Sequence, residues 1–120
     1  MNGPPGVLPD VIWHDSVGST NDEAQARVSL NDSSPVWIAA AEQTRGKGRL
    51  GRHWVSEPGN LYASLTWPSE MAPRRLASLS LVAGLAVRDA VIATGIAAPV
   101  QLKWPNDVLV GGKKVSGVLI

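Results

Sequence analysis

The sequence predicts an α/β fold of the α+β type, in which helices pack on a mixed β-sheet. Segments of strand length that are apolar or alternating indicate the sheet, and they lie at residues 11–17, 36–41, 61–67 and 100–104. Gly111-Gly112 joins two further runs as a two-residue hairpin loop. Pro73 and Gly95 bracket a helix of about twenty residues, because proline is typical of the first helical turn and glycine of the residue after the last.

Length and composition limit the classes of protein to which this chain can belong. At 120 residues it is one domain or part of one, with 44% hydrophobic residues and a formal net charge of +1. This balance argues against a general affinity for nucleic acid or membranes. The absence of cysteine excludes disulfides and cysteine metal sites. No secretory signal is recognised, and no uninterrupted apolar run approaches the ~20 residues of a membrane span, so we expect a cytoplasmic protein.

The first segment of the chain is rich in proline and glycine, and we expect residues 1–10 to be a flexible lead-in. Residues 11–17 follow as a short strand. Thr20 and Glu23 then form a T-x-x-E capping box. This pattern predicts that a helix starts at Thr20 and runs to about Val28.

Two central segments differ in their hydrophobic pattern. Residues 36–41 form a continuous apolar run, which predicts a central strand covered on both faces. Residues 61–67 alternate, which predicts an apolar face formed by Leu61, Ala63, Leu65 and Trp67 and a polar face formed by Tyr62, Ser64 and Thr66. The simplest interpretation of Trp13, Trp37 and Trp67 is that they belong to the core.

The long predicted helix has its main apolar stripe at Leu76, Leu79, Ala83, Ala86, Val87 and Ala90. Leu81, Val82 and Leu85 widen this stripe beyond that of an amphipathic surface helix. We therefore expect the helix to be largely buried against the sheet and to have a structural role.

The glycine pair near the C-terminal end of the chain predicts the register of a hairpin. A two-residue loop at Gly111-Gly112 places Leu109 opposite Lys114. Asp107 then lies diagonal to Lys114 on the same face, with Cα atoms ~7–8 Å apart, which a lysine and a carboxylate can bridge. The register thus predicts an Asp107–Lys114 ion pair, whereas Lys113 points the opposite way into solvent.

A basic, glycine-rich stretch at residues 42–54, EQTRGKGRLGRHW, is the most distinctive feature of the sequence, and we call it the basic loop. Four of the eleven Lys and Arg residues lie within eight positions of it, at Arg45, Lys47, Arg49 and Arg52. Glycines alternate with them, at Gly46, Gly48 and Gly51. Glycine lets a backbone approach a ligand closely, and N–H groups flanked by cationic side chains form a cradle for an anion. The basic loop therefore predicts phosphate binding.

Several motifs with similar spacing do not fit the basic loop. Its glycines match GxGxxG, but no amphipathic helix follows them, as a dinucleotide site requires. Arg52-His53 stands where a Walker motif needs Lys followed by Ser or Thr, and the kinase triplets HRD and DFG are absent. His14 and His53 lack partners at ligand spacing, so we expect no metal site there. Taken alone, the basic loop could equally be a solvated loop without function.

Other segments place the basic loop in a wider pattern. The chain carries, in order, Ser19-Thr20-Asn21, the basic loop, NLYASL, KWPNDV and KKVSGVLI. This combination resembles the catalytic domain of biotin–protein ligases, which has a fold like that of class II aminoacyl-tRNA synthetases. The resemblance covers about residues 12–120, so residues 11–120 would be the N-terminal part of such a domain. Two departures are a lysine at position 47, where the family usually has arginine, and a family domain that continues past the last segment.

The resemblance implies a two-step ligase reaction that uses ATP, Mg²⁺ and biotin. The carboxylate of biotin attacks the α-phosphorus of ATP, which gives biotinyl-5′-AMP and pyrophosphate. A lysine of a biotin carboxyl carrier domain, such as that of acetyl-CoA carboxylase, then displaces AMP. Transfers of this kind depend on positive groups near the phosphate oxygens and on the positioning of both reactants.

The resemblance also implies roles for individual residues. Arg49, Lys114 and Asp107 would be catalytic, with Asp107 holding Lys114 and sharing Mg²⁺ only through phosphate or water. Ser19, Thr20, Asn21 and Gln43 would bind the ureido ring of biotin, although helix capping is the local alternative for the first three. The remaining ligand-binding positions are Gly46, Lys47, Gly48, Arg49, Arg52, Trp54, Lys103, Asn106, Lys114 and Gly117, with Trp54 facing the adenine ring.

Three other functions stay open at this point: a lipoate–protein ligase on a related fold, a non-catalytic module that grips phosphate or nucleic acid, and an inactive ligase fragment. The near-neutral charge and the lack of a second basic stripe count against the nucleic-acid module. Because so little sequence precedes the ligase-like block, we expect no winged helix and no DNA binding. We also expect no membrane partner. The apolar residues 115–120 end without a turn, so we expect the 120-residue chain to be inactive alone.

Overall fold

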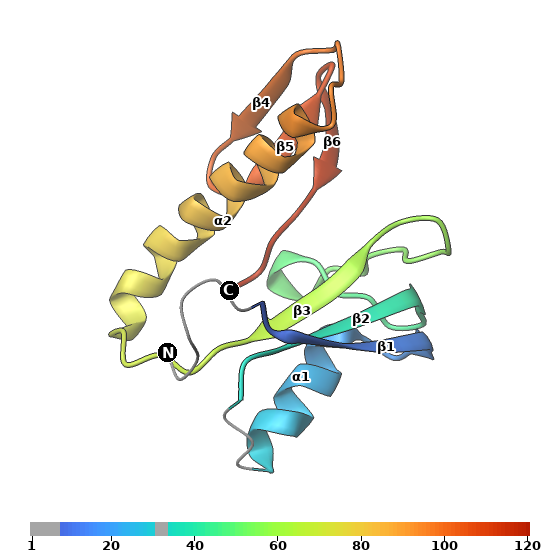
Figure 1. Cartoon of the computed structure of the whole chain (residues 1–120), viewed down its shortest axis with the longest axis vertical. Helices are drawn as coiled ribbons and strands as arrows, with labels where there is room; N and C mark the ends of the chain where they lie inside the picture. Colours follow the sequence, from blue (N-terminus) through green and yellow to red (C-terminus); the bar gives the residue numbers. More distant parts are fainter. Residues whose placement is uncertain (1–7, 31–33) are drawn as a thin grey trace. The chain divides into compact units, whose positions relative to one another are not determined.

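The computed structural model describes residues 8–30 and 34–120. The chain divides into two compact units, Met1–Ser69 and Glu70–Ile120. In the described residues, each unit combines one α-helix with a three-stranded sheet (Figure 1). Most of the expected flexible lead-in, residues 1–7, lies outside the described residues.

The first unit contains strands β1 (Asp10–Val17), β2 (Val36–Gln43) and β3 (Tyr62–Thr66), and helix α1 (Thr20–Ser29). Strand β2 is central, pairing in parallel with β1 and antiparallel with β3. Parallel neighbours need a crossover connection, and α1 supplies it between β1 and β2. The helix packs on β2 and β3. The predicted strands at residues 11–17, 36–41 and 61–67 are thus confirmed.

The N-cap residue of helix α1 lies one position earlier than the sequence pattern predicts. The N-cap is Ser19, whose side-chain oxygen accepts a hydrogen bond from the backbone N–H of Asp22 at 3.0 Å. The predicted Thr20–Glu23 box is therefore wrong. Thr20 is already the first helical residue, and its backbone N–H donates to the side-chain oxygen of Gln43 instead. In a capping box the side chain of Glu23 would accept from this N–H group, but the distant side chain of Gln43 accepts from it instead.

Strand β3 has the two predicted faces, and it buries the polar one. Tyr62 and Thr66 are buried, whereas Leu61 is 79% and Leu65 38% exposed. The reason is that α1 covers the polar face and offers hydrogen-bond partners there. The hydroxyl groups of Thr20 and Ser64 lie 2.8 Å apart.

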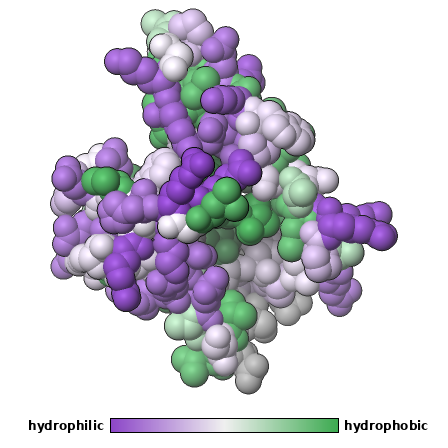
Figure 2. All heavy atoms as spheres, turned by 180° about the vertical axis from the view of Figure 1, so that it is seen from behind, coloured by the Kyte–Doolittle hydropathy of each residue, from purple (hydrophilic) through white to green (hydrophobic). Residues whose placement is uncertain are grey.

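The opposite face of the first sheet carries large apolar side chains that remain accessible. Val36 and Ile38 are buried beneath α1 with Ala24, but Trp37 between them is 37% exposed and Trp13 57% exposed. The expected cover on both faces of β2 is therefore not found in the described residues, and Trp13, Trp37 and Trp67 are not core residues. Figure 2 shows that other hydrophobic residues, in green, also reach the surface among hydrophilic ones, in purple.

The second unit contains helix α2 (Pro73–Ala93) and strands β4 (Val100–Lys103), β5 (Asp107–Val110) and β6 (Lys113–Ser116). The strands pair in sequence order as an antiparallel meander, and α2 packs on β4 and β5. Proline at the first helical position and Gly95 at φ +84° mark the predicted ends of α2.

Helix α2 is much more exposed than the sequence predicts. Of its residues only Gly84 is buried, while Val82 is 60% and Ile92 44% exposed. Three strands of four residues each cannot cover a helix that is apolar on more than one side. By length and composition α2 could also cross a membrane, which is weak evidence because core helices of soluble proteins meet the same criterion.

Candidate functional site

The N-terminus of α1 and the start of the basic loop meet at one edge of the first sheet. Strands β1 and β2 are parallel, so their carboxyl ends lie together, and ligand sites are typical of that edge. The pairing continues beyond the strands, because the backbone N–H groups of Thr44 and Arg45 donate to the carbonyl oxygens of Val17 and Gly18 at 2.9 and 2.7 Å. This arrangement brings Ser19 and Thr20, both buried, beside Gln43.

The basic loop is folded back on itself by backbone hydrogen bonds. The N–H of Trp54 donates to the carbonyl oxygen of Gly46 at 2.8 Å, and that of Gly48 donates to Arg52 at 2.6 Å. Between these contacts a short 3₁₀ turn, η1 (Arg49–Gly51), forms the tip. Leu50 adopts φ +59° and is 88% exposed there. The tip therefore presents its charged side chains to solvent, where a phosphate could reach them.

Gln43 is the best-anchored polar side chain of the predicted site. Its Oε1 accepts from the backbone N–H of Thr20 at 2.8 Å, and its Nε2 donates to the hydroxyl of Ser56 at 3.0 Å. The hydroxyl of Ser56 in turn donates to the carbonyl oxygen of Trp54 at 2.9 Å. This chain of hydrogen bonds ties α1, the end of β2 and the far side of the basic loop together.

The cations of the basic loop do not all point toward open solution. Lys47 forms an ion pair with Asp22 of α1, with 2.5 Å between Nζ and Oδ1. The guanidinium of Arg45 lies over Gly18, because a Cβ atom at Gly18 would be 2.7 Å from its Nη2. Arg49 and Arg52 are exposed. Two of the four cations, Arg45 and Lys47, thus contact residues at or just before α1, and the other two are exposed to solvent.

Trp54 and Gly48 lie together on the returning arm of the basic loop. An added Cβ at Gly48 would be 3.7 Å from the indole ring, which is ordinary contact, and Trp54 is 36% exposed. An indole face that is partly exposed beside a cationic loop can stack on a planar heterocycle. Trp54 therefore offers a suitable surface for the adenine ring that the resemblance implies there.

In the second unit, the predicted hairpin register is confirmed next to the turn, but a β-bulge between Val108 and Leu109 shifts it beyond, so that Val108 pairs with Ser116. Leu109 pairs with Lys114 and Val110 with Lys113, and both loop glycines adopt positive φ, +56° and +79°. Lys114 Nζ lies 3.0 Å from Asp107 Oδ1. The pair is partly exposed, at 41% for the lysine side chain and 25% for the aspartate. Such pairs contribute little stability, so the lysine remains exchangeable.

Asn106, next to that pair, is buried and only partly satisfied. Its Nδ2 donates to the carbonyl oxygen of Val118, while its Oδ1 has no hydrogen-bond partner among the described residues. Gly84 of α2 packs against the same turn, since a Cβ there would lie 3.3 Å from the Asn106 Cα. Glycine therefore allows the helix to approach the turn that carries Asn106 and Asp107. Lys103 and Gly117, also predicted as ligand-binding, are exposed at the ends of β4 and β6.

A metal site made of protein side chains alone is not found in the described part of the chain, where no three His, Cys, Asp or Glu residues lie together. The unpartnered oxygen of Asn106 and the carboxylate of Asp107 are nevertheless the hard oxygen donors that Mg²⁺ takes. Mg²⁺ commonly keeps its waters and binds through one or two carboxylates and substrate phosphates. This donor set fits an ion held in that way.

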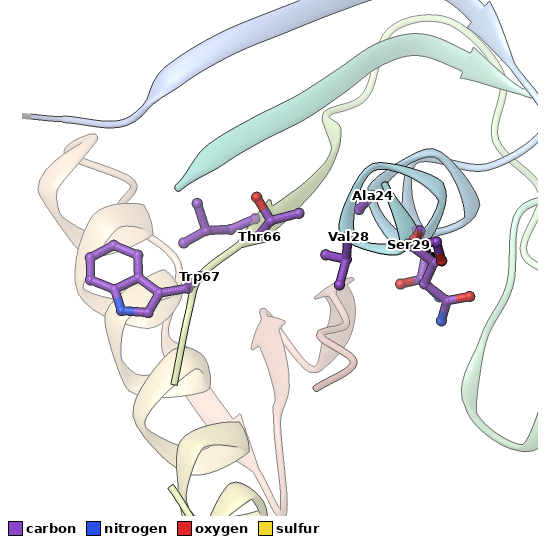
Figure 3. Close-up of a pocket in the computed structure, with 8 residues that line it drawn as sticks. Ala24, Val28, Ser29, Thr66 and Trp67 are labelled. Carbon is purple, nitrogen blue, oxygen red and sulfur yellow. Dashed lines mark hydrogen bonds between the residues drawn. The ribbon is translucent and has the colours of Figure 1, made fainter. Parts of the chain in front are cut away.

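A separate pocket of about 480 Å³ lies between α1 and the end of β3 (Figure 3). Its lining residues are Asn21, Ala24, Gln25, Val28, Ser29, Leu65, Thr66 and Trp67. In Figure 3 Trp67 and Val28 flank opposite sides of it, with Thr66 between them. Of the predicted site residues the pocket contains only Asn21, so it does not coincide with the network around Gln43.

Several residues with direct contacts to the predicted site escaped the sequence-based prediction. They include Ser56, which holds Gln43, Asp22, which holds Lys47, and Gly84, which packs on Asn106. Sequence offered a signal only for Asp22, since an acidic residue in a first helical turn is a plausible partner for a nearby cation. The contacts of Ser56 and Gly84 depend on tertiary packing.

Known proteins with similar sequences are biotin ligases. The biotin--[acetyl-CoA-carboxylase] ligase of Paracoccus denitrificans is 44% identical over 103 residues, covering 85% of this chain and 42% of that protein. The bifunctional ligase/repressor BirA of Escherichia coli strain K12 is 37% identical over 105 residues, covering 87% and 32%. The chain therefore spans less than half the length of these curated relatives.

Solved structures of similar fold confirm the predicted fold class. The biotin protein ligase from Leishmania major in complex with biotinyl-5-AMP superposes with a TM-score of 0.81 at 33% identity, over 94% of this chain and 52% of that one. The biotin protein ligase from Aquifex aeolicus in complex with biotin and ATP gives a TM-score of 0.74 at 41% identity, over 93% and 46%.

The family match extends over almost the whole chain. The model of the biotin/lipoate A/B protein ligase family matches residues 13–120, which include both the basic loop and the Asp107–Lys114 hairpin. With this match, this chain belongs to the biotin/lipoate A/B protein ligase family.

Proposed function

We propose that this chain is part of an enzyme that activates biotin with ATP as biotinyl-5′-AMP and transfers it to a lysine of a carrier domain. The observation that carries the proposal is the junction of a buried, uncharged hydrogen-bonding site at Thr20 and Gln43 with a cationic glycine-rich loop. A neutral polar head group and a phosphate would need these two surfaces side by side. Relatives solved with biotinyl-5-AMP, or with biotin and ATP, support this assignment.

The uncharged part of the site suits the ureido ring of biotin. Ser19, Thr20, Asn21 and Gln43 offer hydroxyl and amide groups, which can donate to a urea carbonyl and accept from its N–H groups. Ser19 and Thr20 are buried, so a ligand there would make its hydrogen bonds away from bulk water. In such a place a polar ligand that matches the donors and acceptors is favoured strongly over one that does not.

The cationic part of the site suits the triphosphate of ATP. Arg49 and Arg52, which are both exposed, would hold phosphate oxygens. Lys47 would join them after leaving Asp22, an exchange that an exposed ion pair permits. Trp54 would stack on the adenine ring. Positive groups in these positions stabilise the charge that develops on phosphate oxygens during transfer.

In the second unit, Lys114 would bind the carboxylate of biotin and then the adenylate linkage. Asp107 orients Lys114 through the ion pair between them. Asp107 would contact Mg²⁺ only through phosphate or water, and the ion would neutralise phosphate charge. Asn106, Lys103 and Gly117 would contact the ligands. The carboxylate oxygen forms a bond to the α-phosphorus as the bond to pyrophosphate breaks. The carrier lysine then attacks the acyl carbon, and AMP leaves.

The carrier that fits the relatives' names is the biotin carboxyl carrier domain of acetyl-CoA carboxylase. A cytoplasmic location accompanies this proposal. Lipoate is the less suitable substrate, because it has no ureido ring for the hydrogen-bonding groups around Gln43.

The test is release of pyrophosphate by the full protein, measured with ATP and Mg²⁺ and either biotin, lipoate or no acid. We expect release with biotin, and biotin transfer to a carrier domain. Release with lipoate in place of biotin would assign the other substrate. Salt-sensitive binding to nucleic acid without pyrophosphate release would contradict the proposal.

A further inference from the structure

Ser56 makes two hydrogen bonds with Gln43 and one with Trp54, although Ser56 and Gln43 are thirteen positions apart in sequence. The hydroxyl of Ser56 accepts from Gln43 Nε2 at 3.0 Å, and the carbonyl oxygen of Ser56 accepts from the Gln43 backbone N–H at 3.0 Å. The same hydroxyl donates to the carbonyl oxygen of Trp54 at 2.9 Å. Ser56 is 5% exposed, so water cannot readily replace these bonds.

The direction of every hydrogen bond in this chain follows from its two ends. The backbone N–H of Thr20 can only donate, so the Gln43 atom that faces it at 2.8 Å must be the oxygen Oε1. The carbonyl of Trp54 can only accept, so the single proton of the Ser56 hydroxyl points to it. The Ser56 oxygen is then an acceptor, and it requires the NH₂ group of Gln43. Both ends therefore impose the same orientation of the amide.

The close packing of Gly46 holds this arrangement in place. A Cβ atom at Gly46 would lie 2.3 Å from both the Ser56 hydroxyl and the Trp54 carbonyl oxygen. The backbone of the basic loop thus lies directly against the hydrogen-bond chain. The orientation of the Gln43 amide is in this way coupled to the folded-back conformation of the basic loop.

We infer that Ser56 is a positioning residue for ligand recognition: its hydroxyl fixes the direction of the Gln43 amide. In this orientation Gln43 keeps one N–H and one oxygen lone pair for a ligand, the complement of one edge of a cyclic urea. A reversed amide would present these groups in exchanged positions. The ligand part of this inference rests on the proposed function, whereas the orientation of Gln43 does not.

The first test uses the ligand-free protein and the side-chain amide protons of its glutamines, observed by NMR. We expect a Gln43 Nε2 proton to exchange with solvent about three- to tenfold more slowly than those of exposed Gln25, because one proton is held by Ser56. Ser56→Ala should remove this protection. Equal exchange at Gln43 and Gln25 in the unaltered protein would overturn the inference, even if Ser56→Ala does not fold.

The second test is a double-mutant cycle on biotin affinity, measured by calorimetry for Ser56→Ala, Gln43→Ala and the double variant. If Ser56 acts through Gln43, Ser56→Ala weakens binding about three- to tenfold alone and adds nothing to Gln43→Ala. An equal loss in both backgrounds would mean a purely structural role. Thr94→Ala, which removes a hydroxyl-to-carbonyl bond at the end of α2, is the control and should leave affinity unchanged.

The two tests separate this inference from the proposed function. An unaltered protein that does not bind biotin would refute the function, and the amide exchange would still decide the role of Ser56. Biotin binding that Ser56→Ala leaves unchanged would refute the inference while the function stands.

Discussion

The two groups of predicted site residues are held in different ways. Around Gln43, uncharged groups form a chain of hydrogen bonds in which Thr20 and Ser56 are buried. In the hairpin, Asp107 and Lys114 form an ion pair whose side chains are 25% and 41% exposed. A buried chain of this kind has one satisfied arrangement, whereas an exposed pair can exchange partners at little cost.

This difference suggests a division of work between the two regions. A fixed network recognises a neutral ligand by shape and by the direction of its donors and acceptors. A loosely paired lysine can leave its carboxylate for an arriving anion and return afterwards. Lys47 with Asp22 belongs to the second kind, although it lies in the first unit. The predictions below follow these classes, from the largest expected effect to the smallest.

The largest effect should come from Gly46→Ala, which attacks the fixed network. The new Cβ would lie 2.3 Å from a backbone oxygen of Trp54, which cannot move without opening the loop. We expect the free energy of unfolding to fall by about 1–3 kcal/mol and biotin binding to be lost. Gly48→Ala is the matched control, since its Cβ would be 3.5 Å or more from any neighbour. Urea denaturation of both variants measures the difference, and equal stability would contradict the packing argument.

Lys114→Ala should test the exchangeable hairpin lysine. Loss of a charge-assisted bond to the biotin carboxylate is worth about 1.5–3 kcal/mol, so biotin affinity and pyrophosphate release should fall roughly ten- to a hundredfold. Stability should hardly change, because the pair with Asp107 is partly exposed.

Lys113→Ala is the control for that prediction, because Lys113 pairs with Val110 and occupies the neighbouring position of the strand. It should alter neither biotin affinity nor pyrophosphate release. A larger loss from Lys113→Ala than from Lys114→Ala would reverse the assignment of the two lysines.

The smallest effect should come from Asp22→Asn, which frees Lys47. The amine no longer has to leave a carboxylate before it meets phosphate, so ATP affinity should rise by a factor of about two to five. Glu23→Gln removes the same charge from the next position of α1 and should change ATP affinity less. Titration with ATP at two salt concentrations measures the effect. Weaker binding by Asp22→Asn would contradict this prediction, because it would mean that the Lys47–Asp22 pair helps the basic loop to bind ATP.

Local sequence was sufficient where neighbouring residues set the geometry. Gly111-Gly112 leaves only a narrow choice of turn, so the sequence alone predicted the register next to the turn and the Asp107–Lys114 pair. It did not predict the bulge between Val108 and Leu109. Pro73 and Gly95 likewise marked the ends of α2. The motif order around the basic loop also identified the family, which the match over residues 13–120 bears out.

Tertiary structure decided which surfaces face each other. The alternating pattern of β3 correctly indicated a strand, but α1 covers its polar face, where the hydroxyl of Ser64 lies 2.8 Å from that of Thr20. On the same face Thr66 accepts a hydrogen bond from the backbone N–H of Val36 in β2. The pattern of a strand shows that its two faces differ, and only the packing of other elements determines which one is buried.

The candidate site divides in the same way. From sequence alone, residue types and spacing indicated the basic loop with Lys47, whereas the resemblance to biotin–protein ligases implied Gln43. The partners of Gln43, 23 residues before it and 13 after it, follow only from the parallel pairing of β1 and β2 and the return of the basic loop. A hydrogen bond between distant residues needs the fold to bring them within about 3 Å, and no local pattern carries that information.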